Sequence, residues 1–106
     1  MTQQQQANIN DFFTPFFRKN TKFRIIYVGA LMRKASLNER EAFQILEHLC
    51  DTNMLKRVYQ FRCPDDSFRQ ILRTNYASLP QTIICPESHE EYNVRDNLFI
   101  VYEVNQ

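Results

Sequence analysis

Glycine is almost absent from this chain: Gly29 is the single glycine among 106 residues. Loops that bind phosphates and dinucleotides need several glycines, because the backbone must approach the ligand closely. The sequence therefore argues against nucleotide-dependent chemistry of the common types. Gly29 lies inside the apolar stretch of residues 25–31, which predicts a position of close helix packing rather than a loop.

Long hydrophobic runs are also missing. No run approaches the roughly twenty apolar residues that a membrane-spanning helix needs, and the chain begins with a polar, glutamine-rich segment. We therefore expect no transmembrane helix, no secretory signal and no membrane partner. Three cysteines, an odd number in a chain with 43% hydrophobic residues, predict a reducing, cytoplasmic setting rather than a disulfide scaffold.

Groups that could perform catalysis are scarce. A nucleophilic cysteine needs a base and an orienting group within reach, and the two histidines are His48 and His89. His48 is expected on the polar face of a helix, and His89 in a turn after Cys85. The adjacent carboxylates Glu90 and Glu91 would point to opposite faces of a strand. The sequence therefore predicts a protein that is not an enzyme.

The N-terminal segment combines a polar start with a cluster of aromatic rings. Residues 1–8 are expected to be a disordered polar tail, and Asn10 is a candidate N-cap for a short helix over residues 11–19. Four phenylalanines either close the core of the domain or form an exposed anchor for a partner or a second copy. These residues are Phe12, Phe13, Phe16 and Phe17.

Two further helices follow. Apolar residues recur at helical spacing over residues 22–34, and Thr21 is a candidate N-cap for that helix. The next helix has the clearest signals, because Asn38 and Glu41 have the spacing of a capping box. Asn53 can adopt the left-handed conformation that ends a helix where glycine is absent. The face of this helix that should be buried comprises Ala42, Phe43, Leu46, Leu49 and Cys50.

The C-terminal half shows the alternation typical of strands. Residues 68–74 fit either a strand or a short helix. The last two strands are expected to form a hairpin closed by residues 95–97, with Leu98, Ile100, Tyr102 and Val104 on the buried face. The expected strands cover residues 56–63, 82–84, 91–94 and 98–104. The whole pattern predicts an α+β fold, with a helical N-terminal half and a small antiparallel β C-terminal half.

A cysteine–proline pair occurs twice, at Cys63 and at Cys85. Each has the layout of a zinc-ribbon knuckle whose second cysteine is replaced, by Asp66 in one case and by Ser88 in the other. A structural zinc site needs four ligands, so we expect less than stoichiometric zinc and no other cofactor. The residues that could still hold zinc are Cys63, Asp66, Cys85 and His89. The alternative is that both cysteines are small buried hydrophobes beside turns.

This order of elements resembles a winged-helix domain that passes into a degenerate zinc ribbon. The resemblance depends on residues 37–49, on the exit through residues 53–55 into the next strand, and on the two Cys-Pro turns. It implies a winged-helix-like part over residues 9–62 and a zinc-ribbon-like β part over residues 63–106, together forming one compact unit. The same layout is similar to small adaptor subunits of bacterial conflict (phage-defence) systems.

Charge is distributed unevenly along the chain. Residues 1–62 hold ten Lys and Arg against five Asp and Glu, whereas residues 63–106 hold three against seven. A basic half with a winged-helix pattern favours DNA binding, because phosphate contacts dominate affinity for DNA. However, the third helix, which would be the recognition helix, has four acidic residues against Arg40 alone. A phosphate backbone would repel that helix.

Two functions therefore stay open. The first is a non-catalytic adaptor or small subunit of a larger intracellular complex, which would also be compatible with a homodimer. Its partner-binding residues would be Phe12, Phe13, Phe16, Phe17, Arg18, Lys19 and Lys22. The alternative is a winged-helix DNA-binding regulator, with nucleic-acid backbone contacts at Arg24, Lys56 and Arg57.

Overall fold

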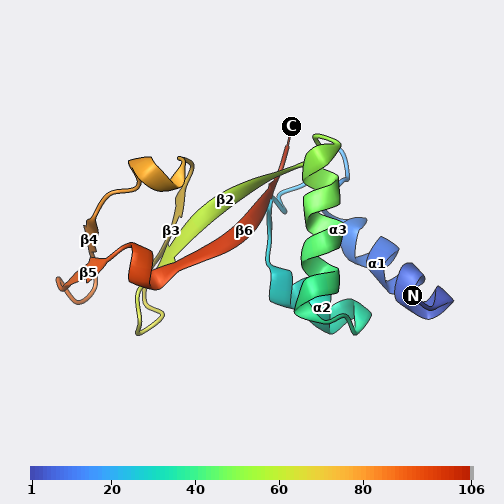
Figure 1. The fold of residues 1–106 in the computed structure, drawn as a ribbon, viewed down its shortest axis with the longest axis horizontal. Helices are drawn as coiled ribbons and strands as arrows, with labels where there is room; N and C mark the ends of the chain where they lie inside the picture. The colour runs from blue at the N-terminus through green and yellow to red at the C-terminus, as the bar shows by residue number, and fades with distance from the viewer. Residues whose placement is uncertain (106) are drawn as a thin grey trace. The chain divides into compact units, whose positions relative to one another are not determined.

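The computed structural model describes residues 1–105 and has an α+β architecture (Figure 1). Three helices lie in the N-terminal half, and antiparallel sheets occupy most of the C-terminal half. The chain forms two compact units. The first unit contains residues 1–57 and the segment that begins at Val101, and the second contains Val58–Ile100. In the described range, no helix combines the length and apolarity needed to cross a membrane.

Helix α1 spans Gln3–Phe13 and begins with a capping box. The Thr2 side chain accepts a hydrogen bond from the Gln5 amide at 3.0 Å, and the Gln5 side chain accepts one from the Thr2 amide at 3.0 Å. The expected disordered tail over residues 1–8 is therefore wrong. These two reciprocal bonds satisfy amide groups that a helix start leaves unpaired.

The position of α1 also corrects the helix predicted over residues 11–19. Asn10 lies inside α1 instead of capping a helix, and its carbonyl accepts from the amide of Thr14 at 3.1 Å. The helix ends at Phe13 because Pro15 has no amide hydrogen with which to continue the hydrogen-bond ladder.

The helix predicted over residues 22–34 is correct in its second half only. Strand β1, Ile25–Ile26, pairs antiparallel with β6, and helix α2 spans Val28–Ala35. The hydroxyl of Thr21 does not cap α2 but donates to the Pro15 carbonyl at 2.6 Å. Gly29 lies in α2, but the neighbour that an added Cβ would meet is the mobile end of Arg33, at 3.2 Å. Close helix packing at Gly29 is therefore not what the structure shows.

Helix α3, Glu39–Asp51, confirms the prediction made for it. The Asn38 side chain accepts from the Glu41 amide at 2.8 Å, and the Glu41 carboxylate accepts from the Asn38 amide at 3.0 Å. Asn53 has a φ of 64°, the left-handed conformation that was expected at the end of this helix. The chain then enters strand β2, Leu55–Arg62.

The strands form two sheets. In the larger sheet the strand order is β1–β6–β2–β3, where β3 is Arg69–Leu72 and β6 is Leu98–Val104. The smaller sheet pairs β4, Thr82–Ile84, with β5, Glu91–Asn93. The ambiguous stretch over residues 68–74 thus contains a strand.

The hairpin predicted between the last two strands is wrong. Residues Arg95–Asn97 form a short 3₁₀ helix, η2, and β5 pairs with β4 instead of β6. Strand β6 lies between β1 and β2 in the larger sheet. Val101, Tyr102, Glu103 and Val104 are all buried, so both faces of the last part of β6 are covered, whereas Ile100 is exposed. The expected alternation of buried and exposed residues therefore fails along this strand.

Each unit has its own hydrophobic core. The core of the first unit joins all three helices to β1, β2 and β6. Its buried residues are Ile9, Phe13, Ile26, Leu31, Ala35, Leu37, Ala42, Leu46, Leu55, Tyr102 and Val104. The core of the second unit is smaller and includes two cysteines. Its buried residues are Phe61, Cys63, Leu72, Leu79, Cys85 and Val94.

Candidate functional site

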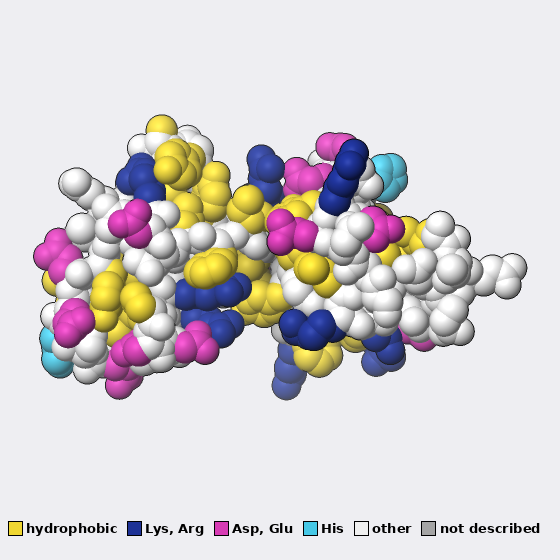
Figure 2. Space-filling model, turned by 60° about the horizontal axis from the view of Figure 1, so that its bottom comes forward, with side chains coloured by type: hydrophobic (Ala, Val, Ile, Leu, Met, Phe, Trp, Pro, Cys, Tyr) yellow, Lys and Arg dark blue, Asp and Glu magenta, His cyan; other side chains and the backbone are white. Residues whose placement is uncertain are grey.

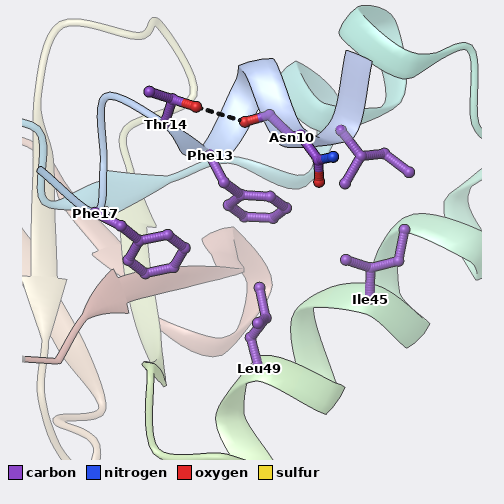
Figure 3. A pocket seen from close by; sticks show the side chains of 7 residues that line it. Asn10, Phe13, Thr14, Phe17, Ile45 and Leu49 are labelled. Atoms are coloured by element: carbon purple, nitrogen blue, oxygen red, sulfur yellow. Dashed lines mark hydrogen bonds between the residues drawn. The ribbon is translucent and has the colours of Figure 1, made fainter. Parts of the chain in front are cut away.

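An apolar groove lies between α1 and α3 in the first unit, and we call it the α1–α3 groove. Its cavity volume is about 420 Å³. Figure 3 shows Phe13 and Phe17 on one side of the hollow, facing Ile45 and Leu49 on α3. The lining residues are Ile9, Asn10, Phe13, Thr14, Phe17, Ile45 and Leu49. The groove therefore offers an apolar surface that the described chain does not fill.

A second hollow lies beside the α1–α3 groove, along α3. It has a volume of about 370 Å³ and shares Ile45 and Leu49 with the α1–α3 groove. These two side chains therefore form a ridge between the hollows. The second hollow is more polar, because Glu41, Gln44 and His48 also line it.

Charge is almost absent from both hollows. Among the side chains that line the two hollows, that of Glu41 is the one with a formal charge when histidine is neutral; Met1, which carries the positively charged terminal amino group, also lines the second hollow. The Glu41 carboxylate accepts the capping hydrogen bond from the amide of Asn38. The side chains of the combined surface are thus mostly apolar, with one carboxylate at its edge.

The outer face of α3 is held in place by contacts on the helix's opposite side. The buried hydroxyl of Tyr102 donates to Glu47 Oε2 at 2.6 Å, and Arg57 Nη1 donates to Glu47 Oε1 at 3.1 Å. Burial, and then the hydrogen bond to Glu47, raise the pKa of Tyr102 above its ordinary value. The hydroxyl therefore stays protonated, and α3 is fixed to β2 and β6 within the first unit.

The predicted aromatic anchor is mainly part of the core. Phe13 is buried, and Phe12, Phe16 and Phe17 are half-buried against the core of the first unit. The rings of Phe13 and Phe17 stack with centroids 5.7 Å apart. Of the two readings given by the sequence, core closure is the one that the contacts match. Phe13 and Phe17 also line the α1–α3 groove with their remaining surface.

The predicted basic residues have different surroundings. Arg18, Lys19, Lys22 and Lys56 are exposed. Two others make contacts inside the first unit: Arg24 Nη2 donates to the Val104 carbonyl at 3.3 Å, and Arg57 pairs with Glu47. In each of the two units, on the face drawn in Figure 2, Lys and Arg side chains lie in separate groups.

The two Cys-Pro turns come together in the second unit. One ligand atom each from Cys63, Asp65 and Cys85 lies within 4.8 Å of the others, and we call these three residues the Cys–Cys–Asp cluster. Both cysteines are buried, and Asp65 is exposed. The Ser67 hydroxyl lies 3.4 Å from Cys85 Sγ and donates to Asp65 Oδ1 at 2.6 Å.

The thiols differ in acidity because they have different surroundings. Burial, helped by a hydrogen bond with Cys85, raises the pKa of Cys63 to about 11. Hydrogen bonds with Ser67 and then with Cys63 lower the pKa of Cys85 to about 6. Cys85 is therefore the thiol that ionises first, and a thiolate is the form that binds metals.

The predicted zinc ligands Cys63, Asp66, Cys85 and His89 do not meet as a set. Asp66 forms an ion pair with Arg69, whose Nη2 lies 2.9 Å from Asp66 Oδ1. Asp66 and His89 have positive φ values of 63° and 62°. They occupy the left-handed positions of their turns, and Asp65 takes the place near the thiols.

Two parts of this picture were missed by sequence reasoning. Ile45 and Leu49 have helical i, i+4 spacing, which could have suggested a second apolar stripe on α3 beside the buried one. Asp65 directly follows the Cys63-Pro64 pair, but the knuckle spacing pointed to Asp66 as the ligand. Which of the two carboxylates lies near the thiols depends on the turn conformation.

Comparison with protein-family models, curated proteins and solved structures found no match to this chain.

Proposed function

We propose that the protein is a non-catalytic adaptor whose first unit binds an amphipathic helix of a partner protein in the α1–α3 groove. The observation that carries this proposal is the apolar lining of the groove. Five of its seven lining residues are apolar, and Ile45 and Leu49 form a ridge with a hollow on each side. Helix-in-groove recognition uses apolar side chains at i, i+3, i+4 and i+7 to fill such hollows.

The dimensions and charge of this surface favour one kind of occupant. The two hollows, about 420 and 370 Å³, fall in the range of roughly 300–1,000 Å³ that is usual for binding pockets. The single charged side chain among the lining residues is that of Glu41. The matching ligand is therefore a helix with an apolar stripe and a Lys or Arg beside it, because an unpaired acidic residue there would be repelled.

The order of elements in the first unit supports a winged-helix character. A helix, the short strand β1, helices α2 and α3, and strands β2 and β6 follow one another, with β6 between β1 and β2. The second unit, which we propose to be zinc-ribbon-like, is then an insertion that begins within β2 and ends within β6. In this arrangement α3 would be the recognition helix, and its outer face is apolar and acidic where DNA would require basic residues. The phage-defence setting stays a prediction.

DNA binding is the second candidate, favoured by the winged-helix order and by exposed Arg18, Lys19, Lys22 and Lys56. It requires affinity for arbitrary duplex that falls steeply between low and moderate salt. Reversing the charges of Arg18, Lys19 and Lys22 together would then abolish that affinity. No duplex binding at low salt eliminates this candidate.

The adaptor proposal is tested with peptides selected against the whole protein from a random helical peptide library displayed on yeast. We expect the selected sequences to share apolar residues at helical spacing with a flanking Lys or Arg. Leu49→Ser should weaken their binding at least roughly tenfold, since central apolar contacts dominate interface energy. The matched control is Met32→Ser, because Met32 is half-buried on the same core but belongs to α2 and lines neither hollow.

The charge requirement has its own variant. Glu41→Gln removes the charge but keeps a side chain that can make the capping hydrogen bond. It should weaken the binding of peptides that carry the flanking Lys or Arg, whereas Glu39→Gln, in the same helical turn, should leave that binding unchanged. If folded Leu49→Ser binds the selected peptides as tightly as Met32→Ser does, the α1–α3 groove is not the binding site.

A further inference from the structure

The two Cys-Pro turns of the second unit share several features, although one is closed by a bond between residues three apart and the other by a bond between residues four apart. Cys63 directly follows β2, and its carbonyl accepts from the Asp66 amide at 2.8 Å. Cys85 directly follows β4, and its carbonyl accepts from the His89 amide at 2.8 Å. Each turn ends in a residue with positive φ. The backbone therefore presents one buried thiol from each turn to the other.

We infer that Cys63, Cys85 and Asp65 bind one thiophilic divalent cation, for which zinc(II) is the best match. Zinc binds thiolate sulfur at about 2.3 Å and carboxylate oxygen at about 2.0–2.2 Å, in a tetrahedron. Two sulfurs on such a tetrahedron are about 3.8 Å apart. The three ligand atoms of the Cys–Cys–Asp cluster already lie within 4.8 Å of one another. A sulfur and an oxygen on the tetrahedron are about 3.6 Å apart, so binding requires a contraction of at most about 1.2 Å.

The chemistry of the donors selects the class of metal. Magnesium and calcium prefer oxygen ligands, whereas thiolates select soft or borderline ions such as zinc. Three protein ligands leave the fourth tetrahedral position to water, as in zinc sites that are not closed by four side chains.

Ser67 completes the site as an orienting group. Its hydroxyl contacts Cys85 Sγ at 3.4 Å, and both its hydroxyl and its amide donate to Asp65 Oδ1, at 2.6 and 3.1 Å. Such hydrogen bonds fix the orientation of metal ligands and strengthen binding. The Asp65 carboxylate is held toward the thiols by this contact, whereas the carboxylate of Asp66 is held by Arg69.

This assignment differs from the ligand set that the knuckle spacing predicts. The two sets share the cysteines, but the third ligand is Asp65 rather than Asp66, and His89 has no role. The metal would join the turn after β2 to the turn after β4, within the second unit. Since a ligand that binds only the folded state stabilises it, zinc should raise the melting temperature of the protein.

The test is a titration of the reduced, metal-free protein with cobalt(II), followed by displacement with zinc(II). We expect thiolate-to-cobalt charge-transfer absorption and tetrahedral visible bands that saturate at one cobalt per chain. Cys63→Ser and Cys85→Ser should each remove the charge-transfer absorption or reduce it by about half, and Asp65→Asn should lower the affinity at least roughly tenfold. The controls Cys50→Ser, Asp66→Asn and His89→Gln should match the wild type.

Zinc-edge X-ray absorption of the wild-type protein keeps the proposal testable if a cysteine variant does not fold. Two sulfur atoms at about 2.3 Å and lighter atoms in the remaining positions are expected. The absence of cobalt absorption, a zinc spectrum without sulfur, or four sulfurs would overturn the site. An affinity that depends on Asp66 and His89 but not on Asp65 would overturn the proposed third ligand.

Discussion

Replacing Tyr102 by phenylalanine tests how α3 is held against the strands of the first unit. The hydroxyl is buried and donates to Glu47 at 2.6 Å. A hydrogen bond to a charged group contributes about 1.5–3 kcal/mol to stability. The Glu47 side chain is 42% exposed and keeps its bond to Arg57, so water can partly replace the lost donor. We therefore expect Tyr102→Phe to lower the free energy of unfolding by about 1–2 kcal/mol at pH 7.

The effect should depend on pH in a direction set by the raised pKa of Tyr102. A folded-state pKa above the unfolded value, which is about 10 for tyrosine, means that the stabilisation is complete below pH 10. Above pH 10 the unfolded state releases the proton and the folded state keeps it. The wild type should therefore lose about 1.4 kcal/mol per pH unit relative to Tyr102→Phe, so the difference between them shrinks.

The assay is urea unfolding of both proteins at pH 7, 10 and 11, with equal slopes required for the comparison. Tyr76→Phe is the control, because Tyr76 is 54% exposed, and it should leave the unfolding midpoint at pH 7 unchanged. An unchanged midpoint for Tyr102→Phe at pH 7, or a difference from the wild type that is the same at pH 11 as at pH 10, would refute this account of the Tyr102–Glu47 bond.

Four further substitutions test the helices by the same unfolding measurement. Leu46→Ala should lower the free energy of unfolding by about 2–5 kcal/mol because Leu46 is fully buried. His48 is exposed, so His48→Ala should change it by less than about 0.5 kcal/mol. Equal effects would mean that the face of α3 assigned to the core is wrong. Asn38→Ala should cost about 1 kcal/mol by removing the cap of α3, and a neutral result would contradict the capping box. Gly29→Ala should stabilise by up to about 0.5–1 kcal/mol, since alanine favours the helix and the Arg33 side chain can move away; a loss of stability would mean that this side chain is held in place.

Local signals explain the parts of the fold that the sequence predicts well. The capping box of α3 and the left-handed Asn53 involve residues close together in the chain, so their spacing alone identifies them. The same kind of signal was present at the start of α1, where Thr2 and Gln5 form a capping box. It was overlooked because the glutamine run has the composition of a disordered tail.

Pairings between distant residues explain the errors. Ile25 and Ile26 have neighbours spaced as in a helix, but they pair with Glu103 and Tyr102 of β6. The stretch before β6 looked like a hairpin turn, and the strand instead pairs with segments far away in the sequence. No local pattern contains the information that β6 lies between β1 and β2.

The candidate sites also have parts that local sequence signals predict and parts that only the fold determines. The sequence identified the two Cys-Pro turns and both buried cysteines, because cysteine and proline are rare enough to be noticed. The knuckle spacing chose Asp66, whereas Asp65 is the carboxylate near the thiols; the turn conformation, in which Asp66 has a positive φ, could not be read from the sequence. The α1–α3 groove could not be predicted from the sequence either, because its two walls come from segments that meet only in the folded first unit.

The most direct test of the adaptor proposal is methyl NMR of the whole protein with a peptide selected from the helical library, and separately with an arbitrary DNA duplex at low salt. The proposal predicts that the peptide shifts the methyl resonances of Ile9, Ile45 and Leu49 and leaves Ile84, an exposed residue of the second unit, unchanged. The duplex should shift none of them. Peptide-induced shifts that avoid Ile45 and Leu49, or shifts on α3 produced by the duplex alone, would contradict the claim that the α1–α3 groove binds a partner helix.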